Sequence, residues 1–308
     1  MTRDRRVIAA FGFDMETDIG SWTPFYQGVV KGTPRLLDLL SAHEVSATFY
    51  FTGHAARTHP EVVHAVDAAG HEVGCHSLYH ETVGDELFSI PGTYPLLAEE
   101  VPLRLKRATE WVTAALGRRV VSFRSPRLFG STAVVNALEA LGYESDASYP
   151  LYYYRERLTP YHPNRSNWTA EGDSPMLEIP NFADLSIESK GPLGRDRDQW
   201  PKYRTEGAQS LLAAVDSFTA IAHGRGLPAV LCFYLHPWEF IEMPQDLIRF
   251  GEGAVQPDSF IVSGCGDHAL RQLAAVLTGL RQRGFVFCTA RQIAKTWDNV
   301  QGQDLPNV

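Results

Sequence analysis

The sequence has no hydrophobic run long enough to cross a membrane. Its 308 residues contain nothing close to the ~18 consecutive apolar residues that a membrane span requires. The amino-terminal residues are basic, but the apolar run after them is short and is broken by Gly12 and Asp14, whereas a secretory signal has a longer apolar core. We therefore expect a protein without a membrane partner and, by default, a cytoplasmic one.

Paired cysteines are also lacking. The four cysteines, Cys75, Cys232, Cys265 and Cys288, are widely spaced and form no CxxC pair. All but Cys265 lie in or at the end of apolar, strand-like runs, which is typical of buried free thiols. The pattern favours thiols over disulfides or a thiolate metal site.

The sequence also lacks an excess of positive charge. The chain has 28 basic and 36 acidic residues, a formal net charge of −8. This balance argues against nucleic acid or an anionic membrane as the main partner. A hydrophobic content of 44% with 21% charged residues is ordinary for a soluble enzyme. A neutral or weakly charged substrate fits best, and the sequence leaves open whether the chain forms a homo-oligomer.

Short apolar strands alternate with amphipathic helices along most of the chain. Thr33 as N-cap and Pro34 after it predict one helix start, while Pro60 and Gly70 bound another helix. The predicted strands cover residues 6–13, 45–53, 70–74, 120–124, 176–182, 227–236 and 285–288, and the predicted helices 33–44, 59–70, 96–116, 131–142, 208–223, 267–284 and 289–297. This alternation predicts a parallel sheet with crossover helices.

About seven βα units favour one α/β barrel over two domains. Residues 149–203 are rich in Tyr, Pro, Asn and charge. We expect this segment to form long loops on the barrel rim, with one strand at 176–182, because aromatic residues are too frequent for a disordered linker. The prediction is a single domain over residues 1–308 with a rim-loop insertion at 149–203.

Polar residues follow the predicted strands at their carboxyl ends, where barrels bind ligands. Almost every predicted strand contributes one or more, and another strand is expected to end near Asp146. They are Asp14 with Glu16 and Asp18, His76 with His80, Arg124, Asp146, and His236. The convergence of these side chains on one rim predicts an active site there.

His76 and His80 lie four residues apart directly after a strand. Such a pair is commonly a strand cap, but one helical turn would bring both side chains to one face. Imidazole suits zinc and related ions, and a carboxylate as third ligand leaves a place for water. Asp14, Glu16 and Asp18 could form a solvated acidic turn, yet three acids at a strand end are costly unless a cation neutralises them. One carboxylate would then hold the metal and another would accept a proton from water.

The remaining candidates have both structural and catalytic interpretations. Arg124 could pack its stem on the barrel with its head in water, or pair with Asp14 and keep it ionised. His236 could be a buried histidine bonded to the backbone, or a general acid that protonates a leaving amine. Asp146 could be a turn residue, or could orient His236 and raise its pKa.

Together these motifs resemble the polysaccharide deacetylases of the NodB-homology type, carbohydrate esterase family 4. The motifs are FGFDMETD, HSLYH, RSP, DASY and LH, in that order, and GHEVGCH is the most characteristic piece. FDMETD and LHPWEF are most similar to the intracellular branches. The resemblance extends over residues 7–297 and implies a distorted (β/α)7 barrel that hydrolyses an N-acetyl amide, usually on a sugar, with a divalent metal: zinc first, cobalt or nickel as alternatives.

By this resemblance Asp14 is the catalytic base, and His76 with His80 are metal ligands. Arg124 holds the base, and His236 is the catalytic acid. The chain departs from the family where the usual adjacent acidic pair is replaced by Asp14-Met15-Glu16, so Glu16 becomes the expected carboxylate ligand and Asp18 the alternative. The second acid of the fourth motif is replaced by Ser148, which leaves Asp146 to act on His236.

Three functions are compatible with this pattern. The first is deacetylation of a carbohydrate. The second is hydrolysis of a small cyclic imide or ureide, as in allantoinase- or imidase-like branches. A narrow pocket roofed by residues 152–155 would favour this second function, and an open groove would favour an oligosaccharide. The third is an inactive carbohydrate-binding barrel, against which the retained base, acid and metal ligands argue.

Overall fold

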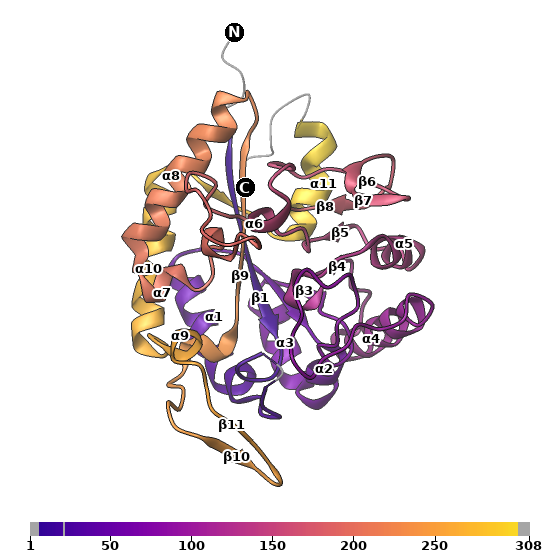
Figure 1. The fold of residues 1–308 in the computed structure, drawn as a ribbon, viewed down its shortest axis with the longest axis vertical. Helices are drawn as coiled ribbons and strands as arrows, with labels where there is room; N and C mark the ends of the chain where they lie inside the picture. The colour runs from indigo at the N-terminus through magenta and orange to yellow at the C-terminus, as the bar shows by residue number, and fades with distance from the viewer. Residues whose placement is uncertain (1–5, 21, 301–308) are drawn as a thin grey trace.

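The structure is a computed structural model that describes residues 6–20 and 22–300, with side chains to residue 298. A curled parallel sheet forms its centre (Figure 1). The sheet strands are β1 (Val7–Met15), β2 (Thr48–Phe51), β3 (Glu72–Cys75), β4 (Ser122–Phe123), β5 (Ser145–Asp146), β8 (Leu177–Glu178), β9 (Ala229–Leu235) and β12 (Val286–Phe287). Within the described residues no helix is both long and apolar enough to span a membrane.

Strand β1 organises the sheet. It pairs with β9 along almost its whole length, with β12 at Ile8 and Ala9, and with β2 from Gly12 to Met15. On the far side, a parallel bridge between Asn181 and Cys232 joins the segment after β8 to β9. The parallel order from β1 through β5 and β8 back to β9 confirms the predicted distorted (β/α)7 barrel.

Helices cover the outside of the sheet (Figure 1). The longer ones are α1 (Thr33–Ala42), α3 (Pro60–Ala68), α4 (Val101–Leu116), α5 (Thr132–Ala140), α8 (Ala208–Gly224), α10 (Asp267–Gln282) and α11 (Ala290–Val300). α3 begins at Pro60, as predicted. The Ser131 hydroxyl accepts a hydrogen bond from the backbone N–H of Val134 and so caps α5.

Two predicted helix starts are wrong. Thr33 is not an N-cap, because the π-helix η1 (Gly28–Gly32) runs directly into α1 and Gly32 takes the cap position. The helix predicted from residue 96 begins at Val101, with Pro102 in its first turn. Proline is well tolerated there, since the first helical N–H groups have no intrahelical acceptor.

The segment 149–203 contains more regular structure than the loops predicted for it. It holds α6 (Leu151–Tyr154), a hairpin of β6 (Pro163–Asn164) and β7 (Asn167–Glu171), the 3-10 helix η3 (Arg195–Arg197) and the start of α7 (Lys202–Thr205). β8 lies within the predicted strand and pairs with β5 in the main sheet. A second excursion after β9, which the sequence analysis did not predict, contains η4 (Pro237–Phe240), the hairpin β10 (Ile248–Phe250) and β11 (Gly253–Val255), and α9 (Ser259–Val262).

Two glycines make room for functional parts of the molecule. A Cβ on Gly12 in β1 would lie 2.2 Å from a guanidinium nitrogen of Arg124, so only glycine lets that side chain cross the barrel interior. A Cβ on Gly28 would lie 2.3 Å from the backbone nitrogen of Trp238. This close approach packs η1 against η4, directly after His236.

The core has two parts. A small cluster fills the barrel interior, and a large cluster packs the sheet against the helices. All four cysteines are buried and free, which confirms the prediction for Cys75, Cys232 and Cys288 and extends it to Cys265.

Candidate active site

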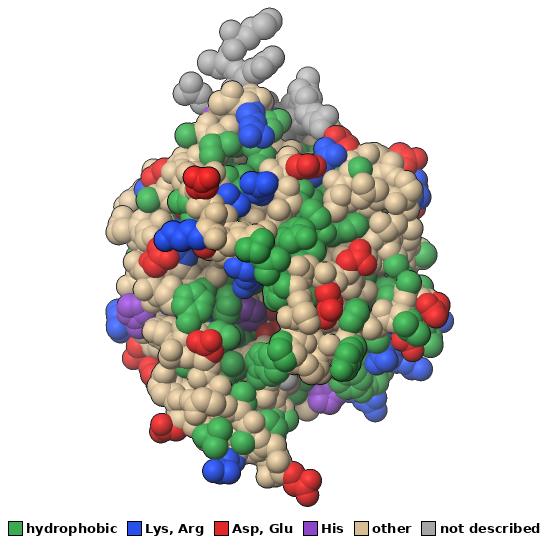
Figure 2. All heavy atoms as spheres, viewed as in Figure 1, with side chains coloured by type: hydrophobic (Ala, Val, Ile, Leu, Met, Phe, Trp, Pro, Cys, Tyr) green, Lys and Arg blue, Asp and Glu red, His purple; other side chains and the backbone are tan. Residues whose placement is uncertain are grey.

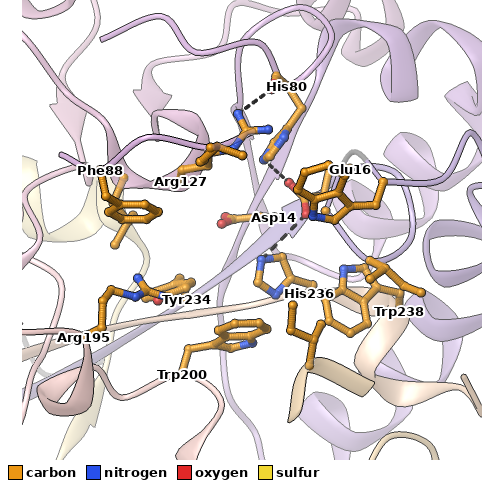
Figure 3. Close-up of a pocket in the computed structure, with 16 residues that line it drawn as sticks. Asp14, Glu16, His80, Phe88, Arg127, Arg195, Trp200, Tyr234, His236 and Trp238 are labelled. Carbon is orange, nitrogen blue, oxygen red and sulfur yellow. Dashed lines mark hydrogen bonds and ion pairs between the residues drawn. The ribbon is translucent and has the colours of Figure 1, made fainter. Parts of the chain in front are cut away.

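A pocket of about 270 Å³ opens at the carboxyl ends of the barrel strands. Asp14, Glu16, His80 and His236 lie in its wall, and Figure 3 shows Asp14 between the two histidines. These four of the residues predicted to converge on one rim therefore meet there. Residues 152–155, which as a roof over a narrow pocket would have favoured a small cyclic substrate, are not among those that line the pocket.

Glu16, His76 and His80 form a compact buried cluster. One ligand atom from each lies within 4.8 Å of the others. The Oε2 atom of Glu16 is 3.5 Å from Nε2 of His76 and lies in close contact with Nε2 of His80. Both the strand end of β1 and the turn after β3 are rigidly placed by the sheet, which fixes the spacing of the three side chains.

The chemistry of this cluster fits a divalent cation. Nδ1 of His76 lies 2.8 Å from the carbonyl oxygen of Arg124. Since a carbonyl can only accept, Nδ1 carries the proton and Nε2 presents a lone pair toward Glu16, the arrangement usual in metal-bound histidines. Nε2 of His76 and Oε2 of Glu16 are buried, and neither has a hydrogen-bond partner among the described residues. A cation between them would satisfy both atoms.

The protonation states of Glu16 and His80 favour metal binding. Burial alone would raise the pKa of Glu16, but His80 and His76 outweigh it and hold that pKa well below its ordinary value. Burial lowers the pKa of His80, which favours the neutral imidazole despite the opposing effect of Glu16. An ionised carboxylate beside neutral imidazole is the donor set that zinc prefers.

Asp18, the alternative carboxylate, points elsewhere. Its two oxygens accept hydrogen bonds from the backbone N–H groups of Gly28 at 2.7 Å and Gln27 at 3.0 Å. Burial raises its pKa to about 6 in spite of these bonds. Asp18 therefore fixes the start of η1, while Glu16 faces the histidines.

Asp14 and Arg124 form a buried ion pair. An η-nitrogen of Arg124 donates to Oδ1 of Asp14 at 2.9 Å, and the remaining donors bond to the carbonyl oxygens of Ala147 and Phe233 and to the thiol of Cys232. The guanidinium also lies over the ring of Tyr50, 4.5 Å from its centroid. Burial opposes the charge, but Asp14 raises the pKa of Arg124 above its ordinary value. The other oxygen of Asp14 is 4.0 Å from Nε2 of His76, so one carboxylate spans from the arginine to the metal cluster.

His236 faces the cluster from β9 on the opposite side of the pocket. Its Nε2 is 3.8 Å from Oε1 of Glu16, and its Nδ1 is 3.0 Å from Oε1 of Glu239. A carboxylate at Nδ1 fixes the proton on that atom and directs Nε2 to the pocket. Burial alone would lower the pKa of His236, but Glu239 and Glu16 raise it above its ordinary value.

Glu239 is a functional candidate that the sequence analysis missed. It is fully buried and accepts hydrogen bonds from Trp200 at 2.9 Å, Tyr203 at 2.9 Å and Arg204 at 2.7 Å. Burial is outweighed by Arg204 and His236, which lower its pKa to about 2. Its position three residues after His236, across Pro237 at a helix start, forms a capping box and is the signal that could have identified it.

Asp146 does not occupy the place predicted for it. Its carboxylate accepts a hydrogen bond from the Ser148 hydroxyl and lies beside Glu178, its register partner across β5 and β8. The carboxylate at Nδ1 of His236 is that of Glu239 instead. The prediction was wrong about the orienting residue because it took a partner from a neighbouring strand end, whereas the partner comes from the turn that follows His236.

The buried carboxyl pair makes stability depend on pH. Burial and mutual repulsion raise the pKa of Glu178 well above its ordinary value, and burial raises that of Asp146 to about 6. A raised carboxyl pKa lowers stability as pH rises from about 4, since the unfolded chain releases protons that the folded chain retains. Glu178→Gln should therefore raise the free energy of unfolding by about 1–3 kcal/mol at pH 8 and by little at pH 4. Urea unfolding at both pH values measures this, with the exposed Glu252→Gln as control; an equal effect at both pH values would contradict it.

Residues 18–145 match the family model for polysaccharide deacetylase. The match covers less than half of the chain and supports the resemblance to polysaccharide deacetylases inferred from the motifs. Among curated relatives, the peptidoglycan-N-acetylmuramic acid deacetylase PdaA of Bacillus subtilis is 29% identical over 123 residues, which cover 39% of this chain and 43% of the relative. A chitooligosaccharide deacetylase of Azorhizobium caulinodans is 27% identical over 111 residues, 36% of this chain and 48% of the relative. The chain thus matches less than half the length of either relative.

Solved structures resemble the chain over nearly its whole length. A probable polysaccharide deacetylase of Pseudomonas aeruginosa PAO1 aligns with a TM-score of 0.63 at 14% identity, covering 97% of this chain and 93% of that one. The PuuE allantoinase aligns with a TM-score of 0.61 at 16% identity, with the same coverage. At these identities the similarity shows the fold alone.

Proposed function

We propose that the protein is a metal-dependent hydrolase that removes an N-linked acetyl group from a carbohydrate. The observation that carries the proposal is the buried cluster of Glu16, His76 and His80, with Asp14 on one side and His236 on the other. The named activities of the curated relatives, peptidoglycan and chitooligosaccharide deacetylation, support the same reaction class. A barrel that only binds sugar would have no need of a base, an acid and a metal cluster in one pocket.

Glu16, His76 and His80 would hold the metal. When bound, a divalent ion activates water and polarises the amide carbonyl. Asp14 accepts the proton of the attacking water, because its carboxylate borders the cluster and Arg124 keeps it ionised and oriented. Asp18 stays outside this chemistry, since both its oxygens bind backbone N–H groups.

His236 would act as the general acid. Its Nε2 faces the pocket, 3.8 Å from Oε1 of Glu16, and protonates the nitrogen of the leaving amine. Glu239 holds the ring in position through Nδ1 and favours the protonated form. The acid and the base thus approach the scissile amide from different strand ends, β9 and β1.

Glu239→Gln should lower kcat about tenfold or more and move the alkaline limb of the pH–rate profile to lower pH. A general acid works while protonated, and its raised pKa extends activity toward alkaline pH; removing the charge of Glu239 lowers that pKa. Steady-state rates across pH 5–10 measure the effect. Glu242→Gln, in the same excursion but exposed, is the matched control. An unshifted alkaline limb would show that Glu239 does not act on His236.

The direct test of the reaction class is acetate release from N-acetylated sugars by the zinc-loaded protein. N-acetylglucosamine and its β-1,4-linked oligomers are suitable substrates, with allantoin and a cyclic imide assayed beside them. Acetate release supports the proposal, and opening of the cyclic amides without acetate release would replace it with the second candidate.

That second candidate, hydrolysis of a small cyclic amide, is favoured by one observation. The pocket is small, about 270 Å³, and walled mainly by apolar and aromatic side chains. A small pocket suits a compact ring better than an extended glycan. The same metal cluster, base and acid would serve both reactions, because each breaks a carbon–nitrogen bond of an amide.

A further inference from the structure

Loops surround the pocket mouth and are joined to their neighbours around it. The loop after β1 contacts α2 (Gly53–Thr58), where the Tyr26 hydroxyl lies 2.7 Å from Nδ1 of His54. The His54 ring lies 5.2 Å from that of Tyr79 in the loop after β3. These contacts connect the loops after β1 and β3 on one side of the pocket.

The loop after β3 is joined to the next two segments. Arg127, after β4, donates to the carbonyl oxygen of His80 at 3.1 Å. The ring of Phe88 packs edge-on against Phe129, with centroids 5.0 Å apart. Phe88 also meets Arg195 of η3, whose guanidinium lies 5.5 Å from the ring centroid. Figure 3 shows Arg127, Phe88 and Arg195 side by side along one wall.

The remaining sides are closed by the excursion after β9. Trp200 packs edge-on against Trp238, with centroids 6.2 Å apart, and donates to Glu239. Outside the pocket lining, Phe250 of β10 packs against Phe25 of the loop after β1, with centroids 6.1 Å apart, and so joins these two segments. Neighbouring segments are therefore in contact around the mouth, and Figure 2 shows the hollow in the middle of this face with hydrophobic side chains beside it.

Arg195 holds the pocket wall opposite His236 in place. Its guanidinium forms an ion pair of 2.9 Å with the buried Asp198 and lies 4.9 Å from the ring centroid of Tyr152. Asp198 also accepts a hydrogen bond from the hydroxyl of Tyr234, which lines the pocket. This network, with the buried Asp198 at its centre, anchors η3 to β9, so the wall is a built part of the fold.

The pocket wall is better suited to ring faces than to a row of hydroxyl groups. Among the described residues that line it there is no Ser, Thr, Asn or Gln side chain. Aromatic rings of Phe88, Trp200 and Trp238 offer flat apolar faces instead. The indole N–H of Trp238 is buried without a hydrogen-bond partner among the described residues, which leaves one donor for a ligand acceptor. The volume of about 270 Å³ lies at the lower limit for small-molecule sites.

We propose that the pocket accepts a single N-acetylated ring, either free or at the end of a chain, and excludes internal units of a glycan. An internal unit carries chain on both sides and needs a groove open at both ends. The joined loops leave only the mouth as an exit. This inference rests on the proposed deacetylase function and specifies its substrate.

The test compares N-acetylglucosamine with the hexamer of β-1,4-linked N-acetylglucosamine, using the zinc-loaded full chain. We expect at most one acetyl group to be lost from each hexamer, at a chain end located by tandem mass spectrometry. If the monosaccharide is also deacetylated, a free ring is a substrate. If only the end of the hexamer is deacetylated and the monosaccharide is not, the substrate is a terminal unit of a chain. Loss of acetyl groups from internal positions would overturn the proposal.

Calorimetric binding keeps the inference testable if the reaction class is wrong. We expect the hexamer to bind no more than about threefold more tightly than the monosaccharide, because only one ring enters. Hexamer affinity more than tenfold higher would overturn the single-ring pocket even without turnover. Absence of acetate release from both sugars would count against the proposed function alone.

Phe88→Ala should open the wall, because it removes the contact between Phe88 and Arg195. We expect the ratio of hexamer to monosaccharide binding affinity to rise at least fivefold. Phe260→Ala, a ring that is 58% exposed and does not line the pocket, is the control and should leave the ratio unchanged. An unchanged ratio in Phe88→Ala, with a folded protein by circular dichroism, would contradict the role of this wall.

Discussion

Removal of divalent metal by a chelator should reduce hydrolysis to background, and added zinc or cobalt should restore it. The expectation follows from the cluster of Glu16, His76 and His80. Its Nε2 of His76 and Oε2 of Glu16 are buried without hydrogen-bond partners in the part of the chain that the structure describes. Acetate release is measured before chelation, after it, and after stepwise addition of metal. Restoration should be complete at one equivalent per chain.

Magnesium is the control for this experiment. It prefers oxygen ligands and six-fold coordination, so it should not restore activity in a site with two imidazoles. Circular dichroism of the metal-free protein shows whether the barrel persists. Full activity of a folded, metal-free protein would contradict the proposed mechanism.

Asp14→Asn should lower kcat by a factor of about 10² to 10⁴, the range typical of a lost general base. The amide keeps the shape of the side chain but cannot take up the proton from water. The substitution also leaves the fully buried Arg124 without its counter-charge, which should destabilise the fold by about 3–5 kcal/mol. Steady-state kinetics and thermal unfolding measure the two effects separately.

The control for Asp14→Asn is Asp38→Asn, an exposed acid on α1, which should change neither quantity. The metal content of Asp14→Asn distinguishes base from ligand. Because Asp14 borders the cluster without belonging to it, we expect one metal per chain to remain. Retention of at least half of the wild-type kcat would contradict the role of Asp14 as base.

Much of the barrel could be predicted because its elements are encoded locally. The apolar strand that became β1, and the proline and glycine that bound the helix 59–70, follow from short-range preferences. The π-helix η1 could not be predicted, since it depends on the tight packing of Gly28 against Trp238, far away in sequence. The hairpin β10–β11 was missed for a different reason. Its short strands are only partly buried and show little periodicity.

The site was predictable to the extent that parallel strands deliver their ends to one rim. This rule brought Asp14, His76, Arg124 and His236 together from positions up to 222 residues apart in the sequence. It could not choose between Glu16 and Asp18, because that choice depends on which backbone N–H groups lie nearby. The strand-end rule also could not identify Glu239, because this residue lies in the turn after His236. Its partners Trp200, Tyr203 and Arg204 come from another segment.

The most direct test of the metal centre is a cobalt titration followed by visible absorption, in the wild type, Glu16→Ala and Asp18→Asn. We expect one cobalt per chain in the wild type and in Asp18→Asn, because the Asp18 oxygens bind the backbone of Gln27 and Gly28. Glu16→Ala should bind at least tenfold more weakly, since it removes the one carboxylate of the cluster. Tight binding by Glu16→Ala together with weak binding by Asp18→Asn would contradict the account.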